Sequence, residues 1–432
     1  MTADFTAMDL EQPVAEGGIE KVNFFNGRLL TAGDMTREQS AARSASERLG
    51  QALGDGVAFG LEVSALAPDG TDPLASIMVQ PGLAISRDGQ MLRLAQPERI
   101  RLSRVDSTSF AAGGCAFDDC VPLAGGTYVA GEGLYLLTVA AAERGAGRAR
   151  SNGLAATGAP CDIDRRIDTV RFRLLEVPSK LYAGLNVLDP GFRNTIAYAC
   201  FGPGVRAAWA SDLLAGGARS PATIDRDAGL LDRMAAEGLS DTEVPLALIG
   251  FTGAAKLSLL DNWAVRRPLS APDVPGAFHS TTAPRRAAIG RAMLAQFETQ
   301  LEELRAAATP ALKARTHFPT LPPVGVLPRM SAAEALDFLG GMTVRGPVHI
   351  NSATVEGLLR ESLTHPALPA DGLEIVWLYA VAENAMAAVK AAADPAKADP
   401  YLVFASANLA YRADARFNLH RWNYANYALG GG

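Results

Sequence analysis

The chain contains 432 residues, 48% of them hydrophobic and 20% charged, and its formal net charge is −6. This balance is typical of a folded globular protein and excludes an intrinsically disordered one. The negative charge gives no support for non-specific nucleic-acid binding, and the length predicts two or three domains.

The beginning of the chain lacks the pattern of a secretory signal. Residues 1–13 carry Asp4, Asp9 and Glu11 and have no basic region before an apolar core. No apolar run approaches the roughly 20 residues that a membrane-spanning helix needs. We therefore expect a protein without membrane insertion that stays in the cytoplasm or leaves it as part of an assembly.

A short aromatic-rich hairpin is predicted at Asn26-Gly27, because a two-residue primed turn needs residues that tolerate positive φ. Phe24-Phe25 precedes this turn and Leu29-Leu30 follows it. Thr31 and Asp34 then have the spacing of a capping box, in which a hydroxyl and a carboxylate satisfy free N–H groups at a helix start. A helix of roughly 20 residues should follow.

Two glycines, Gly54 and Gly56, should end this helix. The apolar period then changes to two, so residues 57–63 are predicted to form one strand with a single buried face. Further short strands are predicted at residues 77–79, 83–85 and 91–94. The first hundred residues thus predict a hairpin, a helix and a small antiparallel sheet.

Strands and long loops are predicted in the middle of the chain. Gly- and Ala-rich sequences predict loops at residues 105–126 and 143–160. Residues 133–139 form a buried apolar run, and residues 167–177 alternate so that apolar and charged side chains face opposite ways. Residues 244–251 and 257–265 are expected to be paired strands, which favours a β-rich central domain.

The longest predicted helix covers residues 288–308. Its apolar face is formed by Ile289, Met293, Phe297, Leu301 and Leu304, which recur at steps of three and four. Docking on another subunit would use such a face. Packing on the chain's own core explains it more simply.

The C-terminal third begins with a proline-rich stretch at residues 317–328. Its proline spacing permits a polyproline II recognition segment, but an ordered crossover on the core is favoured. Ser331 and Glu334 form a second capping box. Strands are predicted at residues 373–381 and 401–405, with an alanine-rich helix at residues 383–393 between them.

Aromatic and arginine residues alternate near the C-terminus, from Tyr411 to Tyr427. Such side chains suit a contact with another protein, a nucleic acid or a carbohydrate, and they also suit a tail that packs on its own domain. The last explanation is the simplest. The candidate partner-binding residues of the whole chain are Phe24, Phe25, Arg28, Phe417, Arg421, Trp422 and Tyr424.

The four cysteines are Cys115, Cys120, Cys161 and Cys200. A four-thiolate zinc site is one hypothesis, but the first pair lacks the two-residue spacing of such sites and the other two are isolated. Free thiols are favoured in a cytoplasmic protein. A disulfide between Cys115 and Cys120 is the alternative if the assembly is released from the cell.

The sequence contains no recognisable catalytic motif, and in particular no serine-hydrolase elbow. Residues 54–60 look like a dinucleotide fingerprint, but they follow a helix and lead into a strand, the reverse of a phosphate site. The five histidines lack metal-binding spacing. We therefore expect no enzyme activity, no cofactor and no metal, although the spatial separation of a carboxylate pair acting on glycans is not visible in a sequence.

Several blocks of the sequence together resemble a family of uncharacterised structural proteins of phage-tail-like contractile injection systems, associated with the baseplate or tail fibre. The first block is residues 24–31, followed by Glu38-Gln39 and residues 60–63. Later blocks are residues 164–168, 263–267, 321–328 and 415–417, with Arg421-Trp422. The resemblance covers nearly the whole chain. The helix after Thr31 departs from it, because alanine and serine replace bulkier aromatic and basic residues.

The resemblance implies a structural part of an injection particle, assembled in the cytoplasm, with other tail and baseplate proteins and further copies of this chain as its partners. The alternative is a particle-borne glycan-binding adhesin or glycan-acting enzyme. The expected fold class is α+β and multidomain, with β-rich antiparallel sheets and a few amphipathic helices. The predicted domains are a docking domain at 1–104, a β-rich domain with long loops at 105–271, and an α+β domain with an aromatic tail at 272–432.

Overall fold

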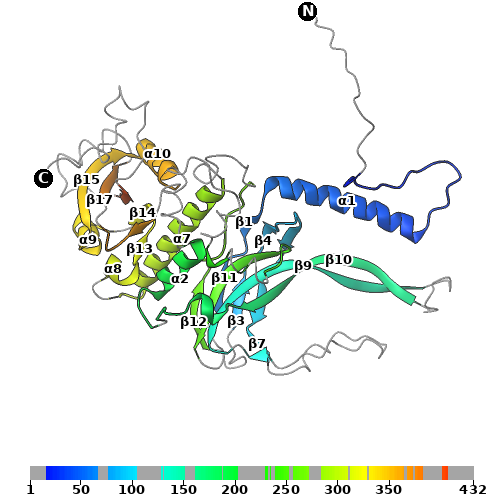
Figure 1. Cartoon of the computed structure of the whole chain (residues 1–432), viewed down its shortest axis with the longest axis horizontal. Helices are drawn as coiled ribbons and strands as arrows, with labels where there is room; N and C mark the ends of the chain where they lie inside the picture. Colours follow the sequence, from blue (N-terminus) through cyan, green and yellow to red (C-terminus); the bar gives the residue numbers. More distant parts are fainter. Residues whose placement is uncertain are drawn as a thin grey trace, which may run out of the picture.

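The computed structural model of the chain shows an α+β fold with several sheets, as predicted (Figure 1). The residues that it describes are 16–66, 76–104, 128–129, 131–150, 161–186, 188–202, 229–231, 234, 239–252, 256–271, 284–309, 312–327, 330–363, 367–372, 375–382 and 401–406. Two predicted elements lie outside these residues: the loop at 105–126 and the helix at 383–393. The division into domains at 104 and 271 stays a prediction.

Helix α1 (Ala32–Leu53) has the start and the end that the sequence predicts. The Thr31 hydroxyl accepts a hydrogen bond from the Asp34 N–H, and the Asp34 carboxylate accepts one from the Thr31 N–H, so the capping box is complete. Gly54 ends the helix with a φ of 98°, and a side chain there would collide with the backbone of Ser270.

Two three-stranded antiparallel sheets follow α1, in the orders β1–β4–β5 and β2–β3–β6. Their strands are β1 (Gly56–Gly60), β2 (Val63–Leu66), β3 (Ser76–Val79), β4 (Gly82–Ile85), β5 (Met91–Leu94) and β6 (Glu98–Arg101). The single strand predicted over residues 57–63 is therefore wrong. Leu61 has a φ of 60°, which breaks the extended chain and sends it from one sheet to the other, and its side chain is fully buried. A short pair, β7 (Ser103–Arg104) with β8 (Tyr128–Val129), completes this region.

The longest strands form a four-stranded antiparallel sheet in the order β10–β9–β11–β12. Its strands are β9 (Gly133–Arg150), β10 (Cys161–Glu176), β11 (Glu243–Thr252) and β12 (Lys256–Asp261). The pairing of residues 244–251 with the following strand is confirmed. Val170, Phe172 and Leu174 face the core from β10, so its predicted alternation is also confirmed over that stretch.

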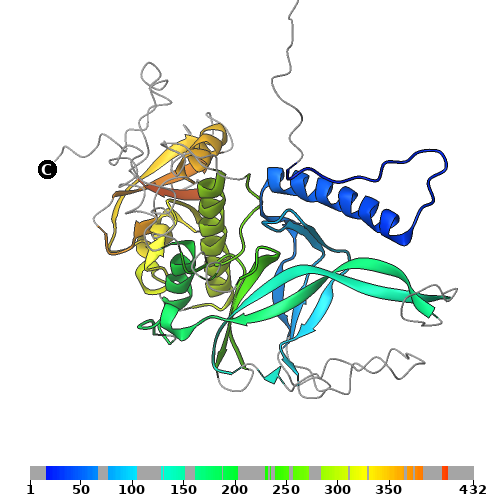
Figure 2. The same cartoon turned by 45° about the vertical axis from the view of Figure 1, so that its right-hand side comes forward.

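A two-stranded arm extends from this sheet. β11 accompanies β9 only as far as Ala140, and the remainder of β9 pairs with β10 alone among the described residues. We call residues 141–150 and 161–170 the arm. It projects from the same side of the molecule as α1 in both views (Figure 1, Figure 2). The loop predicted at 143–160 is thus wrong as far as Arg150, because pairing with a distant strand outweighs the low strand propensity of its Gly and Ala residues. Residues 151–160 lie outside the described part.

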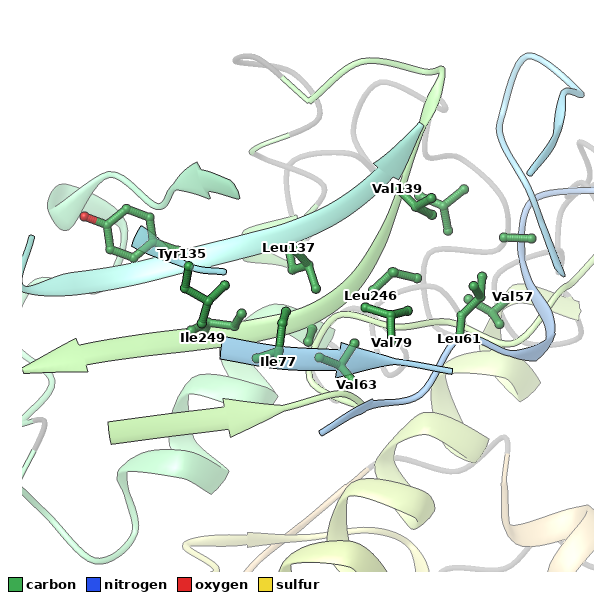
Figure 3. Close-up of a cluster of buried hydrophobic side chains, with 14 of the residues drawn as sticks. Val57, Leu61, Val63, Ile77, Val79, Tyr135, Leu137, Val139, Leu246 and Ile249 are labelled. Atoms are coloured by element: carbon green, nitrogen blue, oxygen red, sulfur yellow. The ribbon is translucent and has the colours of Figure 1, made fainter. Parts of the chain in front are cut away.

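The first hydrophobic core lies between the small sheets and the large sheet (Figure 3). Val57, Leu61 and Val63 approach it from the N-terminal strands, and Leu137 and Val139 from β9. The intervening residues of β9, such as Leu136, face a second core on the opposite side of the sheet. The base of β9 is therefore buried on both faces, which explains its nearly continuous apolar sequence.

Two helices cover that second face, α2 (Phe192–Phe201), which follows a 3-10 turn at Ser179–Leu181, and α7 (Pro284–Ala306). The predicted apolar face of α7 is confirmed, and it packs on the chain's own core. Met293 belongs to the core against the large sheet, whereas Phe297 and Leu301 belong to a third core in the C-terminal region. One helix thus joins two cores.

The C-terminal region contains a second four-stranded sheet in the order β14–β18–β17–β15. Its elements are α8 (Ala314–His317), β13 (Thr320–Leu321), β14 (Val324–Leu327), α9 (Ala332–Phe338), β15 (Thr343–Asn351), α10 (Ser352–Ser362), β16 (Leu368–Pro369), β17 (Ile375–Ala382) and β18 (Tyr401–Ser406). β15 and β17 are parallel, a departure from the antiparallel expectation, and their connection contains α10. The ordered crossover at residues 317–328 is confirmed, since β14 is buried against β18. The capping box of Ser331 and Glu334 is also confirmed.

Candidate functional site

The N-terminal segment, residues 16–31, runs back along α1 in the opposite direction. Three contacts hold it there: Arg48 to the Gly17 carbonyl at 2.5 Å, the Val22 N–H to Glu38 at 3.3 Å, and Arg28 to Asp34 at 2.6 Å. Val22 is buried as a result. The segment is therefore fixed on the helix along its length rather than paired with a strand.

A tight turn forms at Asn26-Gly27, but it is not the predicted primed turn, because Gly27 has a positive φ and Asn26 does not. The Arg28 N–H donates to the Phe25 carbonyl at 3.1 Å, and Gly27 has a φ of 91°. The residues on either side of the turn form no strands, so the predicted hairpin is wrong apart from the position of its turn. The Arg28 guanidinium carbon lies 5.9 Å from the centre of the Phe25 ring, a cation–π contact that orients both side chains.

Large apolar side chains of this segment face solvent. Phe24 is 56% exposed, Phe25 61%, and Leu29 89%. Single exposed apolar residues are ordinary, but a run of them around one turn is typical of a surface that contacts another molecule.

Helix α1 adds a second set of exposed apolar residues. Met35 and Leu49 are separated by 14 residues, close to four helical turns, so they lie on one flank, and Leu53 is one turn further along. All three are about half exposed or more. Next to this flank, Gly50 packs so closely on the backbone of Gly89 that a side chain would not fit, so α1 touches the body there.

We call these seven exposed side chains the N-terminal platform. Its members are Phe24, Phe25, Leu29, Leu30, Met35, Leu49 and Leu53.

Hydrogen bonds stabilise the charged form of Asp34 at the base of the platform. The Thr31 backbone N–H at 3.0 Å has the largest effect, followed by the Thr31 hydroxyl and the Arg28 guanidinium. Together they lower the pKa of Asp34 from 3.8 to about 2. One carboxylate thus caps the helix and fixes the arginine beside the exposed Phe25.

An ion-pair cluster links α1 to the arm. Arg43 donates to Glu143 at 2.7 Å and lies 3.7 Å from Asp168, while Arg166 reaches Glu143 at 3.0 Å. The hydrogen bonds from Arg43 and Arg166 lower the pKa of Glu143 below its ordinary value. These groups are exposed, so the cluster orients the arm relative to α1 more than it stabilises the fold.

A second candidate site is a cavity of about 790 Å³ between the large sheet and helices α2 and α7. Tyr182, Asp189, Thr299 and Glu303 are among the polar residues that line it. An aromatic ring, hydroxyls and carboxylates around one hollow suit a polar organic ligand.

The most buried charge of the cavity wall, Arg193, is already paired within the protein. Its Nε lies 2.6 Å from Asp261 Oδ2, and its other nitrogens contact Glu303. Burial opposes the charged form, but Asp261 and Glu303 outweigh it and raise the pKa of Arg193. Gln296 also donates to Asp261 at 3.3 Å. This network joins β12 to α2 and α7, so it holds the fold together and is not arranged for an anionic ligand.

Asn262 has a comparable structural role. Its side-chain oxygen accepts from the Val63 N–H at 3.0 Å, and its nitrogen donates to the Val63 carbonyl at 2.9 Å. The carboxamide thus takes the place of a neighbouring strand at the edge of β2. Nothing in the local sequence around Asn262 indicates a contact with a residue so far away.

Of the candidate partner-binding residues, the structure brings Phe24, Phe25 and Arg28 together around one turn. Phe417, Arg421, Trp422 and Tyr424 lie outside the described residues, so their role stays a prediction. The exposed flank of α1 is not among the predicted partner-binding residues, although the spacing of Met35 and Leu49 could have indicated it.

The metal hypothesis concerns four cysteines, of which Cys115 and Cys120 lie outside the described residues. Cys161 begins β10, and Cys200 is buried in α2. Within the described part, no group of three or more His, Cys, Asp or Glu side chains is arranged to hold a metal ion. The same residues include no helix that combines the length and apolar character needed to cross a bilayer.

Comparison with models of known protein families finds no match, and comparison with curated proteins finds no similar sequence.

Proposed function

We propose that the protein is a non-enzymatic structural component of a phage-tail-like contractile injection particle, near its baseplate or tail. The proposal gives the N-terminal platform the role of docking surface for another protein of the particle. Assembly takes place in the cytoplasm, and neither nucleic acid nor membrane insertion is part of it.

The exposed platform is the observation that carries this proposal. Phe24, Phe25 and Leu29 face water on a segment that hydrogen bonds tie to α1 at Val22 and Arg28, which lowers the cost of ordering it on binding. Aromatic side chains and a neighbouring arginine, Arg28, are the residue types enriched at the energetic centres of protein interfaces.

The sequence blocks that resemble proteins of contractile injection systems supply the identity of the partners. The first of these blocks, residues 24–31, is the same stretch that forms the turn of the platform. A docking role for this stretch agrees with that resemblance.

The test is incorporation of a tagged variant, Phe24→Ser with Phe25→Ser, into particles purified from cells. Both side chains are more than half exposed, so the folded chain should keep its circular dichroism and its thermal midpoint. We expect loss of the variant from particles because the hydrophobic anchor is removed. Normal incorporation of the folded variant would overturn the proposal.

A matched control is Leu336→Ser on α9. This residue is also exposed, at 40%, but it lies in the C-terminal region away from the platform. The control should enter particles normally, which separates loss of docking from a general effect of removing exposed apolar surface.

The cavity beside α2 supports a second candidate function, a particle-borne protein that binds or acts on glycans. Sugar recognition uses aromatic faces together with carboxylates and hydroxyls, and Tyr182, Asp189 and Thr299 provide these groups. Tyr182→Ala should abolish binding to a glycan array while particle assembly stays intact. An array on which the unchanged protein binds nothing would remove this candidate.

A further inference from the structure

The outer edge of β10 is an unpaired strand edge. β10 is the terminal strand of its sheet, and every side chain from Asp162 to Thr169 is exposed. Among the described residues no element covers this edge, and the sequence of β10 contains no proline to block pairing. Free N–H and C=O groups at such an edge recruit another strand, and charged side chains like those of β10 admit only a strand of complementary charge.

The arm has little of its own to hold it together. Its base packs on the first core through Ala141 and Val170 and contacts α1, but further out nearly all side chains of its two strands face solvent. Two-stranded ribbons are at best marginally stable in water, and a third strand supplies the missing hydrogen bonds. An extended arm is therefore accounted for if another strand lies along it.

The order of charges along β10 indicates which strand can pair with it. Opposite residues of an antiparallel pair point their backbone groups either both toward or both away from each other. When two identical strands pair symmetrically, one residue must consequently face its own copy. A charged residue at this centre would face an equal charge, so Asp164, Arg165, Arg166 and Asp168 are excluded as centres.

Three uncharged residues remain as centres in the exposed stretch. Centring on Ile163 places Asp162 opposite Asp164 of the other copy, and centring on Thr169 places Arg165 opposite Arg173. Both registers oppose like charges.

Centring on Ile167 is different. It places the exposed Ile167 opposite Ile167 of the other copy, Arg166 opposite Asp168 on both sides, and Arg165 opposite Thr169. The next pairs outward, Asp164 with Val170 and Ile163 with Arg171, also contain no like charges.

We propose that two copies of this chain pair through their β10 edges, antiparallel and centred on Ile167. The interface joins the arms into one four-stranded ribbon, with an isoleucine pair at the centre and an Arg166–Asp168 pair on each side. Charge complementarity of β10 with itself makes a second copy the occupant of this edge. The pairing is independent of the platform, because the two surfaces use different residues.

Disulfide trapping tests the register directly in the full-length chain. Ile167→Cys is introduced into a parent carrying C115S, C120S and C161S, which leaves Cys200 buried. In the proposed register the two Ile167 α-carbons are about 4.5–5.5 Å apart, within the range for a disulfide. Mild oxidation should give a disulfide-linked dimer in high yield.

Two further cysteine variants fix the register. Arg165→Cys alone should not cross-link, whereas a mixture of Arg165→Cys and Thr169→Cys chains should give heterodimers. Cross-linking of Arg165→Cys with itself, or a failure of Ile167→Cys to cross-link, would overturn the proposal.

Charge reversal provides a second measurement by analytical ultracentrifugation over a concentration series. Arg166→Glu places a carboxylate opposite Asp168 twice and should raise the dimer dissociation constant by at least about tenfold. Adding Asp168→Arg restores opposite charges and should recover the dimer. Arg166→Glu also breaks the contact of Arg166 with Glu143 inside the chain, so Glu143→Gln is the matched control: it removes the same contact off the edge and should leave the dimer intact. An unchanged chain that sediments as a monomer throughout the series would contradict the proposal.

Discussion

Large apolar side chains have opposite environments in two regions of this molecule. In the C-terminal core, Phe297 lies 4.9 Å from Phe318 and 5.4 Å from Phe404 between ring centres, and all three are fully buried. In the N-terminal platform, Phe24 and Phe25 are 56% and 61% exposed. Aromatic residues therefore hold the fold together in one region, whereas in the other they are available to a partner.

We therefore expect the body to fold without the platform. The cores between the sheets and under α7 are formed without any of the seven platform residues. Substitutions in the cores should therefore lower the stability of the fold, whereas substitutions in the platform should impair assembly and leave stability unchanged.

The strongest test of this separation compares two phenylalanines. Phe297→Ala should lower the free energy of unfolding by about 3–5 kcal/mol, because it opens a cavity among three aromatic rings. Phe25→Ala should change it by less than about 0.5 kcal/mol. Urea denaturation followed by circular dichroism measures both, and similar losses in the two variants would contradict the comparison.

The second prediction concerns the polar side chain that completes the edge of β2. Asn262→Ala should lower the free energy of unfolding by about 1–3 kcal/mol, because it leaves the Val63 N–H and C=O without partners in a buried place. Thermal and urea unfolding provide the measurement. A variant as stable as the unchanged protein would show that water or a rearranged side chain replaces the carboxamide.

Secondary structure that depends on neighbouring residues could be predicted from the sequence. Thr31 and Asp34 gave the start of α1, and the steps between Met293, Phe297 and Leu301 gave the buried face of α7. Both signals are local, because capping and helical periodicity involve residues three or four apart.

Features that depend on distant pairing could not be predicted. The arm contains Gly and Ala in β9 and is a strand only because β10 pairs with it. Asn262 bonds to Val63, which is 199 residues away in the sequence, and nothing in the sequence around either residue predicts this contact. The candidate site lies between these cases, since the position of the turn at Asn26-Gly27 was predictable but the path of the segment along α1 was not.

The third prediction concerns the contact between α1 and the body at Gly50 and Gly89. Gly50→Ala should destabilise the protein by about 1–3 kcal/mol despite the higher helix propensity of alanine, because the new methyl group meets the Gly89 backbone. Gly33→Ala is the matched control: its nearest neighbour is 3.6 Å away, so a small gain in stability is expected. Denaturation curves of the two variants should move in opposite directions, and a gain in both would mean that α1 does not rest on Gly89.

The smallest effect is the pH dependence of the α1 cap. The folded-state pKa of Asp34 is lowered to about 2 from 3.8, so its stabilising contribution is complete above pH 3.8 and is lost as the pH falls towards about 2. As the pH falls through this range, amide hydrogen exchange in the first turn of α1 should therefore become faster than the pH dependence of the intrinsic exchange rate alone predicts. Asp34→Asn should remove that step, and a step that persists in the variant would assign it to another carboxylate.

Sedimentation of a native lysate, followed by mass spectrometry of the proteins that travel with the chain, tests the proposed role in a tail-like particle. We expect the chain in a heavy fraction together with sheath and tube proteins, and we expect Phe24→Ser with Phe25→Ser to move it to the light fractions. Migration of the unchanged chain only as a small oligomer, free of such proteins, would rule out that role.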